Sequence, residues 1–166
     1  MDYIKNAVKL RRELHQIPEL GWGEFCTTAK ILETIEPLGW KTFVGVEQIG
    51  LDAVMGRPED FVEKSKKRAL EEGVDPTFIE RMHGYTGTIA ELDTGRPGPV
   101  TALRFDIDCV GVEETDLKDH LPNKENFRSR HAGVMHSCGH DGHTAVGLTM
   151  AQWLSLIHIS EPTRHA

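Results

Sequence analysis

The sequence predicts an α/β fold in which a mixed sheet is flanked by helices. Residues 3–16 and 24–38 carry apolar side chains at helical spacing, and residues 141–154 repeat that pattern. Segments near residues 40, 86 and 100 are rich in β-branched and aromatic residues, which is typical of strands. A chain of 166 residues is long enough to build one domain around a hydrophobic core.

The two N-terminal helices have clear end signals. Pro18 ends the first helix and Gly39 ends the second. His15 lies near the C-terminal end of the first helix, where the helix dipole favours a cation, so we expect it to have a structural role. Residues 40–46 then alternate in polarity and form the first expected strand.

Residues 51–84 are more polar than their surroundings. Pro58 opens an expected helix that runs to about Glu72, and Asp75 caps a second, short helix. The apolar periodicity is sparse in both helices. We therefore expect this segment to be an insertion packed on the surface, where it could line a substrate pocket, and not to form a core layer.

The most distinct strand signals come from residues 86–92 and 100–106. They flank the segment 93–99, whose glycines and prolines favour a loop. The two strands are expected to form a hairpin or to lie near each other in one sheet.

The chemistry of the chain is concentrated in residues 135–144, Met-His-Ser-Cys-Gly-His-Asp-Gly-His-Thr. Thiolate and imidazole are good ligands for zinc and similar ions. Cys138 and His140 are separated by one glycine, so a bend before a helix can turn both toward one ion, whereas a helix would separate them. Alternatively, Cys138 is a small buried apolar residue and His136 and His143 lie on the surface.

Three aspartates are further candidates for this site. Asp106 and Asp108 alternate in an extended segment and point the same way, which suits one for a metal and one for orienting a ligand. The competing interpretation is a polar strand end with an Arg104 ion pair. Asp141 can accept from the free N–H groups of the helix that begins there. Glu113 and Glu114 lie in a polar loop without an evident anchor, so we do not expect a catalytic pair there.

Composition excludes several classes of function. The net charge of −7 and the absence of a basic stripe argue against a nucleic-acid partner. No stretch reaches membrane-spanning length and the N-terminus lacks a signal-peptide core, so no membrane association is expected. Three widely spaced cysteines form no disulfide framework, which favours a cytoplasmic setting.

Three ordered motifs together resemble the M20 metallopeptidase/amidohydrolase family, in its aminoacylase-like branch. They are R-R-E-L-H-Q-I-P-E-L-G-W-G-E at residues 11–24, L-R-F-D-I-D at residues 103–108 and M-H-S-C-G-H-D-G-H-T-A at residues 135–145. Relative to the family pattern, Ser137 replaces an alanine and Phe105 is also a departure, and neither change removes a ligand.

The resemblance implies an incomplete M20-type catalytic domain that cleaves N-acyl amino-acid amide bonds, aminobenzoyl amides among them. It implies two divalent metals per complete site, manganese or zinc, with Cys138 and His140 as ligands and Asp108 in support. Asp106, His136, Asp141 and His143 are candidate site-lining residues. The family's general base is a glutamate on a strand downstream of this motif, and a homo- or hetero-oligomer with a homologous protein chain is also implied.

The C-terminal segment departs from the family pattern. We expect residues 1–154 to be the N-terminal part of the catalytic domain and residues 155–166 to be a non-native tail. On that basis the chain is expected to lack hydrolytic activity of its own. The alternative is a stand-alone metal-binding or regulatory module without catalysis.

Overall fold

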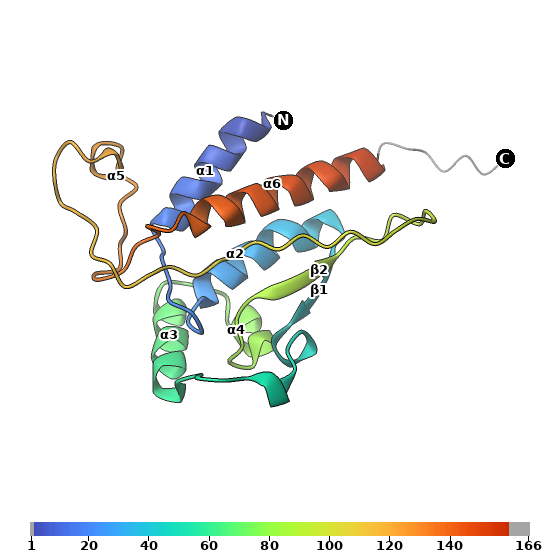
Figure 1. The fold of residues 1–166 in the computed structure, drawn as a ribbon, viewed down its shortest axis with the longest axis horizontal. Helices are drawn as coiled ribbons and strands as arrows, with labels where there is room; N and C mark the ends of the chain where they lie inside the picture. Colours follow the sequence, from blue (N-terminus) through green and yellow to red (C-terminus); the bar gives the residue numbers. More distant parts are fainter. Residues whose placement is uncertain (1, 160–166) are drawn as a thin grey trace.

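The computed structural model of the chain describes residues 2–159. Helices dominate it, and they pack in layers around one small sheet, as the sequence predicts. Figure 1 shows α1 and α6 next to each other, α2 beneath α6, and the sheet with α3 and α4 on the far side of α2. None of the helices in the described part of the chain is both long and apolar enough to cross a bilayer.

Helices α1 (Tyr3–His15) and α6 (His140–Ile159) lie at the two ends of the described chain and pack against each other. Asp2 caps α1 by accepting from the backbone N–H of Lys5. Leu10 and Leu14 of α1 are buried in one apolar cluster with residues of α2 and α6, namely Ile35, Ala145 and Leu148. This cluster fixes the helix that follows the 135–144 loop.

Helix α2 (Phe25–Ile35) contributes to both hydrophobic clusters of the protein. Its first turn is capped from the segment that precedes the helix, because the buried Glu19 carboxylate accepts from the N–H groups of Cys26 and Thr27. Arg68 of α3 lies 2.9 Å from the same carboxylate. Glu19 therefore joins α2 to α3 as well as completing the helix end.

The expectation that residues 51–84 pack only on the surface is wrong. Helices α3 (Glu59–Glu71) and α4 (Pro76–Met82) supply much of the second cluster. The residues from these two helices in that cluster are Val62, Ala69, Ile79 and Met82. The sparse apolar pattern is sufficient because each of these few side chains is almost fully buried against α2.

The sheet consists of β1 (Lys41–Val44) and β2 (Thr88–Glu91), which pair antiparallel with Lys41 opposite Glu91 and Val44 opposite Thr88. Short 3-10 turns, η1 (Glu36–Leu38), η2 (Gly45–Glu47) and η3 (Leu51–Ala53), flank β1. Within residues 2–159 the sheet has these two antiparallel strands alone and is not mixed.

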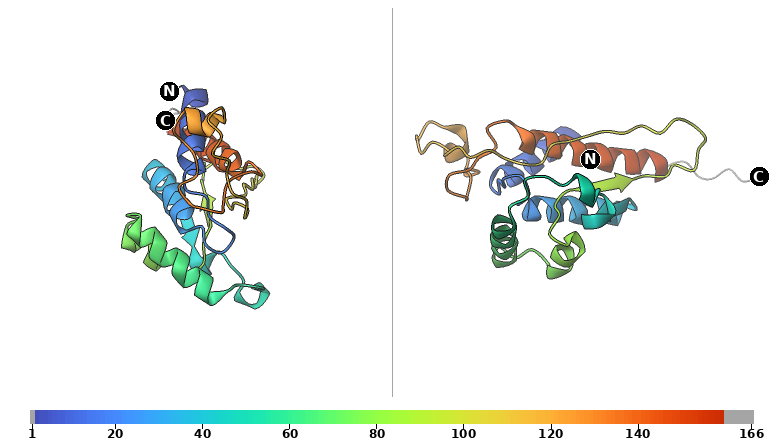
Figure 2. Two further views of the ribbon diagram at one scale, coloured as in Figure 1. Left: turned by 90° about the vertical axis from the view of Figure 1, so that its left-hand side faces the viewer. Right: turned by 60° about the horizontal axis from the view of Figure 1, so that its bottom comes forward.

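The third expected strand, at residues 100–106, does not form in the described chain, and β2 pairs with β1 in place of it. A strand needs a backbone partner, and this segment runs exposed, with Val100 98% and Leu103 55% accessible. In both Figure 1 and Figure 2 it returns along the length of α6. The adjoining loop, which carries α5 (Leu121–Lys124), projects beyond the first turn of α6.

A pair of methionines tests whether residues 51–84 contribute to the core. Met82 is 0% exposed and Met55 is 82% exposed. Met82→Ala is expected to lower the free energy of unfolding by about 2–5 kcal/mol, because it leaves a cavity against α2. Met55→Ala is expected to change it by less than about 0.5 kcal/mol. Urea denaturation measures both, and equal effects would contradict this assignment of the core.

Candidate metal centre

The 135–144 loop is anchored at both ends. Met135 exchanges backbone hydrogen bonds with Val110, at 3.2 and 3.3 Å. Gly139 has φ +78°, a conformation that only glycine adopts readily, and α6 begins at the next residue. The bend predicted between Cys138 and His140 is therefore present, and it sends the chain into α6 at His140.

Three candidate ligands converge at the start of α6. Asp106, His140 and His143 each offer a ligand atom, and these atoms lie within 4.8 Å of one another. The rings of His140 and His143 stack with centroids 5.2 Å apart. Nδ1 of His143 is 3.8 Å from the Asp106 carboxylate. Carboxylate and imidazole in one small space are suitable donors for a divalent cation.

Asp108 holds the His140 ring from the side. Its Oδ1 lies 2.9 Å from Nδ1 of His140, and its backbone oxygen lies 3.0 Å from the same nitrogen. Nε2 of His140 is the ring nitrogen left for a metal, which is the usual arrangement around a ligand histidine. Asp106 also forms an ion pair with Arg104 at 2.8 Å, so the structural role weighed for this carboxylate is present as well.

Two residues of the loop lie outside this group. Cys138 is exposed and is not among the three convergent ligands. His136 is 4% exposed, and neither of its ring nitrogens has a hydrogen-bond partner among the described residues. Burial lowers the pKa of His136 to about 4, so its imidazole is neutral at physiological pH.

The donor set fits a divalent metal. A carboxylate, two imidazoles and an exposed thiol lie in or next to one bend, and a buried imidazole beside them has unsatisfied nitrogens. Buried polar atoms in native proteins nearly always have a partner, so the unsatisfied nitrogens of His136 indicate that the site receives another group.

The carboxylate of Asp141 is directed away from this group and into the protein. Its Oδ2 lies 2.7 Å from Nδ1 of His15 and 2.9 Å from Nε of Arg11, and its Oδ1 accepts from the N–H of Gly142. Burial alone would raise the pKa of Asp141, but the His15 hydrogen bond and the Arg11 charge outweigh it and hold that pKa below its ordinary value. Asp141 therefore lies beneath the site as a buried anion and does not line it.

The expectation that Glu114 lacks an anchor is wrong. Its side chain is buried, and its Oε1 lies 3.0 Å from Nε2 of His15 and 2.9 Å from Nε2 of His120. Its Oε2 accepts from the backbone N–H of Ser129. One signal was available in the sequence: Arg11 and His15 are four residues apart, so both lie on one face of α1, where one acidic cluster can contact both.

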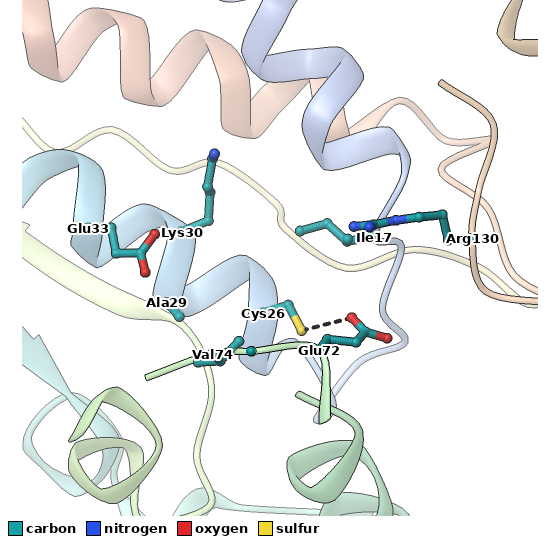
Figure 3. A pocket seen from close by; sticks show the side chains of 9 residues that line it. Ile17, Cys26, Ala29, Lys30, Glu33, Glu72, Val74 and Arg130 are labelled. Atoms are coloured by element: carbon teal, nitrogen blue, oxygen red, sulfur yellow. Dashed lines mark hydrogen bonds between the residues drawn. The ribbon is translucent and has the colours of Figure 1, made fainter. Parts of the chain in front are cut away.

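A separate cavity of about 190 Å³ lies between α2 and the end of α3. Figure 3 shows the Cys26 thiol donating to Glu72 there, and Lys30 and Arg130 also line the cavity. Burial raises the pKa of the Cys26 thiol far above its ordinary value, so this thiol is not a nucleophile. None of the residues around this cavity comes from the 135–144 loop.

The fold is similar to that of a known metal-binding peptidase, and the candidate metal centre lies in the part of the chain that matches the family of that peptidase. Residues 102–165 match the sequence profile of peptidase family M20/M25/M40, so this part of the chain carries the sequence signature of that family. It is 45% identical over 153 residues to a Haemophilus influenzae homolog of one of the subunits of p-aminobenzoyl-glutamate hydrolase. That alignment covers 92% of this chain and 36% of the relative, so the chain spans about a third of the length of the curated proteins it matches.

Two solved structures share the fold. An aminobenzoyl-glutamate utilization protein from Klebsiella pneumoniae superimposes with a TM-score of 0.70 at 32% identity, over 92% of this chain and 33% of that one. A dinuclear metal-binding peptidase of the M20 family from Bacillus subtilis gives a TM-score of 0.59 at 28% identity, over 94% of this chain and 32% of that one. The resemblance inferred from the three sequence motifs is confirmed at the level of the family.

The C-terminal segment remains open to test. Helix α6 continues to Ile159, five residues beyond the expected end at Leu154, and Ser155 is buried and accepts a hydrogen bond from Trp40 Nε1. The family match extends to residue 165. The rest of the expected non-native tail, residues 160–166, lies outside the described residues, and the assignment of residues 155–166 stays a prediction.

Contact between Phe105 and α6 provides a test of how the aspartates are held. A methyl group at Gly147 would lie 2.8 Å from the Phe105 ring, whereas nothing lies within 4 Å of one at Gly142. Gly142→Ala is expected to be neutral or to stabilise by up to about 1 kcal/mol through helix propensity. Gly147→Ala is expected to be about 1–3 kcal/mol less stable than Gly142→Ala, because the ring must move. Thermal unfolding of the pair measures this, and matching midpoints would show that Phe105 does not pack against α6.

Proposed function

We propose that this chain carries the N-terminal half of the metal centre of an M20-type amidohydrolase. The observation that supports this most strongly is the convergence of Asp106, His140 and His143 at the start of α6, within the segment that matches the M20 family. Cys138 and His140 would act as metal ligands, and Asp108 would hold the His140 ring in place.

Two divalent metals, manganese or zinc, are proposed for the complete site, in keeping with the dinuclear Bacillus subtilis relative. When bound, such metals supply Lewis-acid chemistry that polarises an amide carbonyl and acidifies water. The chain's own contribution is orientation and charge. Asp108 and Asp106 add negative charge beside His140 and His143, and neutral His136 keeps a ring N–H to donate to a substrate.

The proposed substrates are N-acyl amino acids, with p-aminobenzoyl-glutamate the first to test. This choice rests on the Haemophilus influenzae relative, which is 45% identical over most of this chain. A homologous second protein chain is a proposed partner, because the name of that relative refers to one of several subunits. A reducing, cytoplasmic setting is proposed because the three cysteines are free and Cys138 must be reduced to bind a metal as a thiolate.

Cobalt(II) is a direct probe of the proposed ligands. The full chain is expected to bind it with a thiolate-to-cobalt charge-transfer absorption that Cys138→Ser abolishes, because the thiolate is the ligand that gives this band. The buried Cys109→Ser variant is the matched control and is expected to keep the band. A band that survives in Cys138→Ser, or a chain that binds no cobalt, would contradict the proposal.

Hydrolysis provides the second test. The 166 residues on their own are expected to release no glutamate from p-aminobenzoyl-glutamate, because the family resemblance places the general-base glutamate downstream of the 135–144 motif. Liberated glutamate is assayed with and without a chelator. Turnover that is abolished both by the chelator and by Cys138→Ser would show that these residues suffice, and it would overturn the expectation of an inactive chain.

A further inference from the structure

A buried charge network lies beneath the first turn of α6. Nδ1 of His15 is 2.7 Å from Asp141, and Nε2 of His15 is 3.0 Å from Glu114. His15 is 2% exposed, and the two carboxylates are 1% exposed. Three ionisable side chains from three segments therefore meet in the interior of the protein.

Each ring nitrogen of His15 contacts a different carboxylate, and this determines the protonation of the ring. An ionised carboxylate only accepts hydrogen bonds, so an imidazole between two of them donates from both nitrogens. His15 is in this way a bridge between Asp141, at the start of α6, and Glu114, in the long loop before the metal motif. A neutral residue with a single donor could not hold both carboxylates.

Arg11 contributes a second donor to the same carboxylate. Its Nε lies 2.9 Å from Oδ2 of Asp141, and it is one helical turn before His15 on α1. Asp141 directly follows the proposed ligand His140. Whatever fixes the Asp141 carboxylate therefore also fixes the backbone that carries the His140 ring.

Stability alone does not account for this network. Leu10 and Leu14 already pack against Ala145 and Leu148 of α6, and apolar contacts of that kind hold two helices together. Burying a cluster of charges costs desolvation free energy, and apolar replacements for such clusters are often as stable or more so. What the network adds is geometry, since charge-assisted hydrogen bonds fix both the position and the orientation of the side chains that they join.

We propose that Arg11 and His15 are positioning residues of the metal centre, which act on His140 through the buried Asp141 carboxylate. The inference rests on the proposed function, because it assigns these residues a role toward the metal. It also explains why a motif at the N-terminus, Arg11 to His15, accompanies a metal motif more than a hundred residues later. Mutation of residues that hold metal ligands in place commonly changes metal affinity by about 10–100-fold.

Arg11 and Arg12 form a matched pair for the test. Both side chains are 37% exposed, and both guanidinium groups lie over the Phe127 ring, at 5.4 and 4.8 Å from its centroid. They differ in their acidic partner, which is the buried Asp141 for Arg11 and the exposed Glu125 for Arg12. Methionine at either position keeps most of the apolar stem and removes the charge.

The experiment is a cobalt(II) titration of the full chain, followed through the thiolate-to-cobalt band, with circular dichroism as the check on folding. Arg11→Met is expected to weaken cobalt binding by about tenfold or more and to shift the band. Arg12→Met is expected to stay within about twofold of the wild type, as a position without contact to Asp141 should. Arg11→Lys, which keeps the charge, is expected to recover part of the affinity.

The outcomes separate this inference from the function on which it rests. A wild-type chain that binds no cobalt contradicts the metal centre itself. A wild-type chain that binds cobalt, with Arg11→Met and Arg12→Met equal in affinity and band, overturns the positioning role alone. His15→Gln is the second variant for the same comparison, and wild-type affinity and spectrum in it would equally overturn the role.

Discussion

The carboxylate of Asp141 is the point on which the geometry of the site depends. It is buried beneath the first turn of α6 and is held from α1 by Arg11 and His15, while His15 also reaches Glu114. Removing one partner from such a cluster leaves a buried charge without compensation, which is strongly destabilising. The same contacts fix the start of α6, and with it the backbone of His140, so scaffold and candidate metal centre share one constraint.

The rest of the structure packs on two faces of α2. One face packs with α1 and α6 behind the metal loop, and the other packs with α3, α4 and β1. The extended segment before the loop is held along α6 by side-chain contacts in place of strand pairing. Phe105 packs over Gly147, and Thr144 donates to the backbone oxygen of Asp106. These contacts bring the aspartates to the histidines.

The sequence predicted those elements that are determined by residues close together in the chain. Helical spacing predicted α1, α2 and α6, and the density of ligand types in residues 135–144 predicted the candidate metal centre. Features that depend on distant partners were not predictable in this way. Glu114 looked unanchored because its partner His15 is 99 residues away, and the segment at 100–106 looked like a strand because composition does not reveal whether another backbone is available to pair with it.

X-ray absorption at the zinc edge of the zinc-loaded full chain tests the proposed metal centre most directly, because it reports which atoms surround the metal. We predict a sulfur neighbour at about 2.3 Å from Cys138 together with nitrogen neighbours at about 2.0–2.1 Å that include His140. A shell of nitrogen and oxygen without sulfur would contradict this, and would leave Asp106, His140 and His143 as a cation site of a different kind.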